Sequence, residues 1–98
     1  MNPAHSGLTS LHATVYGRVQ GVYFRAFVQE HAHALGLTGV VRNVSQPMAV
    51  EVEAEGERTA LEELAGHLQN GPPDARVERV EVEWGEYQGR FGDFRVTG

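Results

Sequence analysis

One arginine in this sequence occupies a position that helix geometry disfavours for a positive charge. The stretch YGRVQGVYFRAFVQEH contains a short loop, bracketed by Gly17 and Gly21, and then apolar residues at helical spacing from Phe24 onward. Arg25 therefore falls in the first turn of the predicted helix. The helix dipole disfavours a cation there by roughly 0.3–1 kcal/mol, whereas a bound dianion would reverse the sign of this effect.

The loop before Arg25 has the features of an anion-binding cradle. Gly17 and Gly21 permit backbone conformations that turn successive N–H groups inward, and the following helix offers its unpaired N-terminal donors to the same place. A guanidinium group can bind two phosphate oxygens at once. From these residues alone, a tight turn followed by a solvated arginine is the interpretation to prefer, because a glycine pair and one arginine are weak evidence for a site. The stretch lacks the G-x-x-x-x-G-K-[ST] pattern of a nucleotide-binding P-loop.

Hydrophobic periodicity indicates the elements that position this loop. Leu11, Ala13 and Val15 alternate with polar residues, which predicts a strand that ends near Gly17. The helix from Phe24 ends at a glycine suited to a left-handed cap. Strands are further predicted at 39–44, 48–56, 80–84 and 94–96, and a second helix over 61–68. In the strand at 48–56, the side chains of Glu51, Glu53 and Glu55 are expected on a solvated face.

The order β-α-β-β-α-β plus a final short strand indicates the α+β class. It suits a ferredoxin-like sandwich, in which one antiparallel sheet carries both helices on one face. We expect a single domain over 1–98, with 1–9 as a flexible N-terminal extension. We expect the strand that ends near Gly17 and the strand at 39–44 to run parallel, with the strand at 48–56 between them. The loop before Arg25 and Asn43 should then lie at the same edge of the sheet. The distance between them should be about two strand spacings of roughly 4.8 Å each.

Composition narrows the possible partners. No segment is apolar for long enough to cross a membrane, and the first ten residues lack the features of a signal peptide, so we expect a cytoplasmic protein. The absence of cysteine excludes disulfides and thiolate chemistry. A net charge of −5 argues against binding to a nucleic-acid backbone. The arginines near the predicted loop still allow a local anion site.

Other polar residues are weaker candidates for chemistry. His31 and His33 lie two apart on a helix and point to different sides, so we expect no metal site. Arg42 should face away from Asn43, because neighbouring side chains on a strand alternate. Surface or boundary positions are expected for the other histidines, His5, His12 and His67.

Two motifs carry a family resemblance. GRVQGVYFR, residues 17–25, resembles the signature of the acylphosphatase family, small enzymes that hydrolyse the carboxyl-phosphate bond of acyl phosphates. GVVRN, residues 39–43, is similar to the second signature of that family. Comparable segments occur at 54–56 and 71–77, and the resemblance extends from about Leu11 to Val96.

The resemblance implies specific roles. Arg25 matches the catalytic arginine, and Asn43 matches the asparagine that orients the attacking water. The substrate phosphate would be bound by Arg25 together with the backbone amides of Gln20, Gly21, Val22, Tyr23 and Phe24. The implied reaction is direct transfer of the phosphoryl group from the acyl phosphate to water, without a metal ion or a cofactor. The resemblance also implies a monomeric enzyme. The implied partners are a small acyl phosphate substrate and inorganic phosphate, or a similar anion, as product or inhibitor.

One departure and one alternative accompany the resemblance. Relatives turn on a glycine after the second strand, whereas this chain has VSQPM at 44–48, in which Pro47 constrains the turn. This change bears on rate and substrate preference. Because ferredoxin-like domains also serve as binding modules, the alternative function is a non-catalytic phosphate-binding or anion-binding regulatory module.

Overall fold

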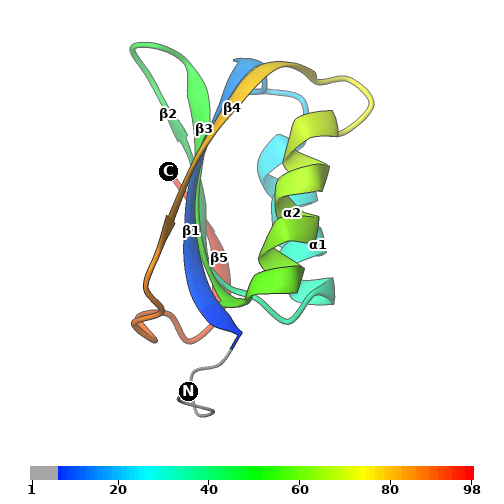
Figure 1. The fold of residues 1–98 in the computed structure, drawn as a ribbon. Helices are drawn as coiled ribbons and strands as arrows, with labels where there is room; N and C mark the ends of the chain where they lie inside the picture. Colours follow the sequence, from blue (N-terminus) through cyan, green and yellow to red (C-terminus); the bar gives the residue numbers. More distant parts are fainter. Residues whose placement is uncertain (1–6) are drawn as a thin grey trace.

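Two helices cover one face of a five-stranded sheet (Figure 1). The computed structural model describes residues 7–98. The predicted order of elements is confirmed, and so is the ferredoxin-like α+β architecture. The elements are β1 (Leu8–Arg18), α1 (Phe24–Ala34), β2 (Thr38–Val44), β3 (Ala49–Glu57), α2 (Arg58–Asn70), β4 (Arg76–Gly85) and β5 (Phe94–Thr97).

The strand order in the sheet is β4-β1-β3-β2-β5. As predicted, β3 lies between β1 and β2, which run in the same direction because each pairs antiparallel with β3. The expected antiparallel sheet is correct except for β5, which pairs parallel with β2. The reason is the connection: β4 ends beside Ser10, near the start of β1, and the following loop brings Phe94 beside Gly39, where β2 begins (Figure 1).

The sheet begins earlier in the sequence than predicted. Of the expected extension 1–9, Leu8 and Thr9 belong to β1, where they pair with Glu57 and Gly56. The hydroxyl of Thr9 also donates to the backbone oxygen of Gly85 at 2.6 Å. Residues 1–6 of the predicted extension lie outside the described residues.

The core lies between the helices and the sheet. Apolar side chains from β1, β2 and β3 pack against those of α1 and α2, and burial at this density is the main source of stability for a domain of this size. The buried residues include Leu11, Val15, Val28, Val41, Val52, Leu61, Leu64, Leu68 and Phe94.

Among the residues described, no helix is long and apolar enough to cross a membrane.

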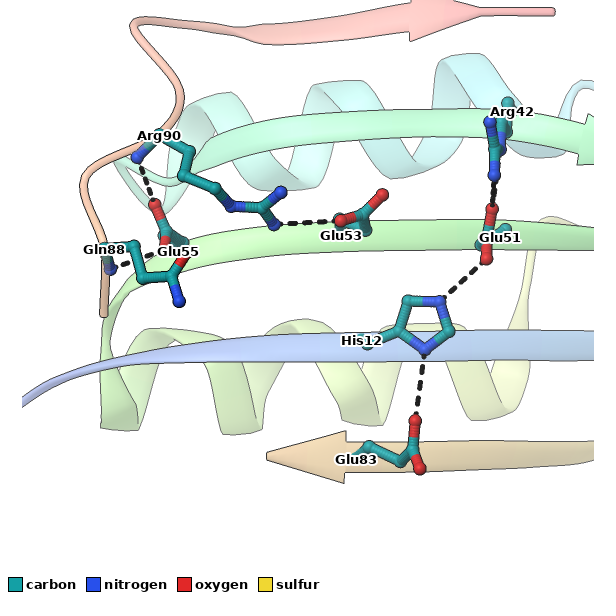
Figure 2. A network of polar contacts seen from close by, with 8 residues as sticks. All are labelled: His12, Arg42, Glu51, Glu53, Glu55, Glu83, Gln88 and Arg90. Atoms are coloured by element: carbon teal, nitrogen blue, oxygen red, sulfur yellow. Dashed lines mark hydrogen bonds and ion pairs between the residues drawn. The ribbon is translucent and has the colours of Figure 1, made fainter. Parts of the chain in front are cut away.

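The sheet face opposite the helices carries a polar network (Figure 2). Glu51 bridges His12, at 2.7 Å, and Arg42, and the side chain of Arg90 donates to Glu53 at 2.9 Å. The prediction of a solvated face is therefore correct for Glu51 and Glu53, whose side chains remain partly exposed.

The same prediction is wrong for Glu55, which is only 1% exposed. The loop that follows β4 folds over this side chain. One carboxylate oxygen accepts the backbone N–H of Gln88 at 2.8 Å and the other accepts that of Arg90 at 2.9 Å, as Figure 2 shows. These two bonds compensate for burial of the charge.

Candidate active site

The loop between β1 and α1 uses left-handed backbone conformations. Gly21 has φ 72° and Tyr23 has φ 69°, and Tyr23 is the N-cap of α1. Among residues 7–98, no side chain caps this helix end, and the first turn of the helix contains no acidic residue. The first N–H groups of α1 have no partner within the helix, and alternation of left-handed residues with others forms a concave array of N–H groups. The local structure is therefore suited to an anion.

A pocket of about 230 Å³ opens at this helix end. It brings together Gly21, Tyr23, Phe24, Arg25 and Asn43, five of the seven residues predicted for the site. The other two, Gln20 and Val22, do not line it. The full lining consists of Val19, Gly21, Tyr23, Phe24, Arg25, Ala26, Asn43 and Val96.

Arg25 reaches the pocket from the first turn of α1, as predicted. Its side chain is partly buried, and one terminal nitrogen donates to the backbone oxygen of Gly98 at 2.9 Å. Gly98 lies beside the backbone of Asn43. The positive end of the helix and the guanidinium thus face the same space, as anion binding requires.

Asn43 reaches the pocket from the end of β2. It pairs with the buried Val50 of β3 and shares its helix-facing side. Its side-chain oxygen is buried, and within residues 7–98 it has no hydrogen-bond partner. A buried acceptor left unpaired costs about 1–3 kcal/mol. Arg42 points to the opposite face and bonds to Glu51, which confirms the predicted alternation.

Tyr23 forms one wall of the pocket. Its hydroxyl donates to a carboxylate oxygen of Glu30 at 2.7 Å. This hydrogen bond, with a smaller contribution from the negative charge of Glu30, raises the pKa of Tyr23. A phenol is protonated at neutral pH even at its ordinary pKa of 10.0, so Tyr23 adds no negative charge to the pocket.

Three lining residues and one side-chain contact were missed by the sequence interpretation. Val19, Ala26 and Val96 line the pocket, but their types are those of core residues and gave no signal. The side chain of Gln20 turns away and donates to the backbone oxygens of Val44 and Ala49. The one sequence feature that could have suggested this contact is the presence of a glutamine in the loop between Gly17 and Gly21.

The turn between β2 and β3 contains Pro47, which is expected from the sequence to constrain it. It occupies 45–48, with Gln46 at φ 61° followed by a cis peptide bond to Pro47. Met48, predicted with the apolar strand residues, belongs to this turn and is 60% exposed. The turn does not contribute to the lining of the pocket.

The histidines have separate surroundings. The ring of His31 stacks on His67, with centroids 3.8 Å apart, whereas His33 lies near Asp93 and the backbone of Phe94. The two histidines of α1 therefore point to different sides, as predicted. In the described part of the chain, no three His, Asp or Glu side chains form a group that could hold a metal ion. His5 lies outside the described residues.

Comparisons with known proteins agree with the motifs. The Acylphosphatase family model matches residues 11–96. The chain is 46% identical to an acylphosphatase of Dehalococcoides mccartyi, over 88% of this chain and 94% of that protein. It is also similar to the structure of an acylphosphatase from Coxiella burnetii, with a TM-score of 0.90 and 41% identity over 99% of this chain and 100% of the other.

The chain also resembles a segment of a longer protein. It matches the crystal structure of T. kodakarensis HypF with a TM-score of 0.78 and 33% identity, over 92% of this chain and 12% of that one. The family model over residues 11–96 and the match over nearly the full length of these acylphosphatases identify the family: this chain belongs to the acylphosphatase family of enzymes.

Proposed function

We propose that this chain hydrolyses the carboxyl-phosphate bond of small acyl phosphates, with Arg25 holding the phosphate and Asn43 positioning the attacking water. The observation that carries the proposal is the unpaired, buried side-chain oxygen of Asn43 in the same pocket as Arg25. An acceptor that has no partner among residues 7–98, beside an anion site, is suited to bind a water molecule that the reaction consumes.

Phosphate binding would use both side-chain and backbone donors. The guanidinium of Arg25 binds two phosphate oxygens, and the amides of 20–24 surround the others. The charge that grows on the phosphoryl oxygens in the transition state meets donors that the fold has already oriented. The left-handed conformations of Gly21 and Tyr23 support this arrangement.

The proposed reaction needs no enzyme nucleophile, because water attacks the phosphorus atom directly. The water held by the side-chain oxygen of Asn43 attacks phosphorus while the bond to the acyl oxygen breaks, and the carboxylate leaves with the bonding electrons. The water proton passes to a phosphate oxygen, since the lining residues in the described part of the chain include no Asp, Glu or His. An acyl phosphate already has a good leaving group, so positioning and charge stabilisation supply the acceleration.

The proposal includes neither a metal ion nor a cofactor, because Arg25 and the helix end supply the positive charge. We further propose that the enzyme is a monomer and that residues 1–98 act as a single domain, as expected for a chain of this size. We place the enzyme in the cytoplasm on the basis of its sequence. Its product, inorganic phosphate, would also be an inhibitor because it fits the same cradle.

The test is hydrolysis of benzoyl phosphate in the presence of EDTA, with phosphate affinity measured in parallel. We expect metal-independent turnover in the native protein. Arg25→Ala should lose at least about a hundredfold in kcat/KM and most of its phosphate affinity. Asn43→Ala should lose turnover but keep most of its phosphate affinity. Arg95→Ala is the matched control, because Arg95 lies next to Val96 on β5 and faces away from the pocket.

Two outcomes would contradict the proposal. Native protein that binds phosphate but does not hydrolyse benzoyl phosphate would indicate the anion-binding regulatory module instead. Activity that disappears with EDTA and returns with a divalent cation would contradict the proposed source of positive charge.

A further inference from the structure

The side chain of Gln20 crosses from the β1–α1 loop to the β2–β3 hairpin. Its amide nitrogen donates to the backbone oxygen of Val44 at 2.6 Å and to that of Ala49 at 3.0 Å. Val44 and Ala49 face each other as the last pair of β2 and β3. A carboxamide has two N–H donors, so this single group uses both of them at the end of the hairpin.

The two segments joined in this way carry the two halves of the candidate site. Gln20 immediately precedes Gly21 in the anion cradle, and Val44 immediately follows Asn43. Within residues 7–98, no backbone hydrogen bond from 19–22 to another loop or turn supplements this contact. The carboxamide of Gln20 is therefore the hydrogen-bonded connection between the cradle loop and the hairpin.

We propose that Gln20 is a positioning residue, whose side chain fixes the distance and orientation between the phosphate cradle and the water-binding oxygen of Asn43. This inference rests on the proposed function. It is separate from the part that the backbone amide of Gln20 plays in the cradle, because the side-chain amide donates to Val44 and Ala49 and Gln20 does not line the pocket.

The physical reason is the geometry of in-line attack. The water must approach phosphorus from one direction and at one distance, and a displacement of about 1 Å can cost on the order of a hundredfold in rate. Binding of the phosphate alone has no such requirement, since Arg25 and the adjacent amides belong to the same loop and helix. Loss of the connection should therefore lower kcat more than it weakens phosphate binding.

The experiment replaces Gln20 with leucine, which keeps the approximate size of the side chain and removes both donors. We expect kcat for benzoyl phosphate to fall roughly tenfold to a hundredfold, with KM and the phosphate inhibition constant changed less than threefold. Gln29→Leu is the matched control. Gln29 also donates its side-chain amide to a backbone oxygen, that of Phe94 at 3.1 Å, but this acceptor belongs to β5 and not to the hairpin that carries Asn43. Its kcat should equal that of the native enzyme.

A double-mutant cycle with Asn43→Ala separates positioning from general loss of stability. If Gln20 acts through the water bound to Asn43, Gln20→Leu should lower kcat little further in the Asn43→Ala background. The melting temperature of each variant is measured as well, to check that each variant is folded at the temperature at which kcat is compared. Equal losses in both backgrounds, or native kcat in Gln20→Leu, would overturn the inference.

Failure of this inference is distinguishable from failure of the proposed function. If Asn43→Ala is impaired while Gln20→Leu is fully active, only the inference fails. If the native protein has no turnover, the proposed function fails and the positioning role of Gln20 fails with it.

Discussion

The side chains of Arg25 and Asn43 line one pocket, the first from the N-terminal turn of α1 and the second from the last part of β2. Both positions carry a local cost to the folded protein. The helix dipole disfavours the cation, and the buried oxygen of Asn43 has no partner among the described residues. Such costs are expected where a site is arranged for a ligand and not for stability alone.

Asn43→Leu should therefore stabilise the protein while it abolishes turnover. Leucine has nearly the shape of asparagine, removes the unpaired acceptor and adds apolar surface beside the core. We expect the free energy of unfolding to rise by about 1 kcal/mol, which corresponds to a melting temperature higher by roughly 4–8 °C. Urea unfolding and calorimetry measure this change. A lower stability would indicate that the oxygen of Asn43 makes a favourable contact in the folded protein.

Glu55→Gln should destabilise the loop that follows β4. The carboxylate accepts one backbone N–H on each oxygen, whereas a carboxamide has only one accepting oxygen and would direct an N–H₂ group at the other donor. We expect a loss of about 1–3 kcal/mol in the free energy of unfolding. Glu53→Gln is the control, since its partner is the partly exposed side chain of Arg90, and a loss below about 1 kcal/mol is expected there. Equal effects of the two substitutions would contradict this account.

Much of this architecture follows from sequence pattern. The alternation of Leu11, Ala13 and Val15 predicted both the strand and its buried side, and the motif around Arg25 predicted the edge of the sheet where the pocket lies. Glu55 was assigned to the wrong environment, because strand periodicity describes one strand and contains no information about a loop that returns from a distant part of the chain. The parallel pairing of β5 was missed for the same reason: its direction depends on the path of that loop.

The side-chain contact of Gln20 shows another limit of pattern. The motif that contains Gln20 predicted a role for the loop backbone only. The side chain of Gln20 donates hydrogen bonds to the backbone carbonyl groups of Val44 and Ala49, and every residue type has such a group. The residue types at the accepting positions therefore give no indication of such a contact. Only the three-dimensional pairing of β2 and β3 places both oxygens within reach of one amide.

Gly17→Ala should be far more destabilising than Gly36→Ala, although both glycines have positive φ values, 128° and 71°. At Gly17, a methyl group would collide with the backbone oxygen of Arg76 and lie 2.8 Å from the amide nitrogen of Glu78, both in β4. At Gly36, it would meet open space. We expect a loss of at least about 2 kcal/mol for the first and about 1 kcal/mol for the second. Similar melting temperatures for the two variants would contradict the close packing of β1 on β4.

Stability should decrease as the pH falls below about 6.5, because of the stacked rings of His31 and His67. Burial lowers the pKa of His31, the positive charge of His67 lowers it further, and the charges of Glu30 and Glu63 oppose this shift in part. The unfolded chain then binds more protons than the folded one between the lowered pKa and the ordinary value of 6.5. Stability is therefore fully present above that value and is lost as the pH falls through this window.

His31→Phe tests this assignment, because it keeps a ring against His67 and removes the titrating group. We expect the difference in unfolding free energy between about pH 7.5 and about pH 5.5 to shrink in this variant, while His33→Gln keeps the native difference. Glu51 does not interfere over this range, since a hydrogen bond from His12 lowers its pKa below the ordinary value of 4.5. A native pH dependence in His31→Phe would assign the effect to another group. Loss of the dependence in His33→Gln would show that the other histidine of α1 is responsible.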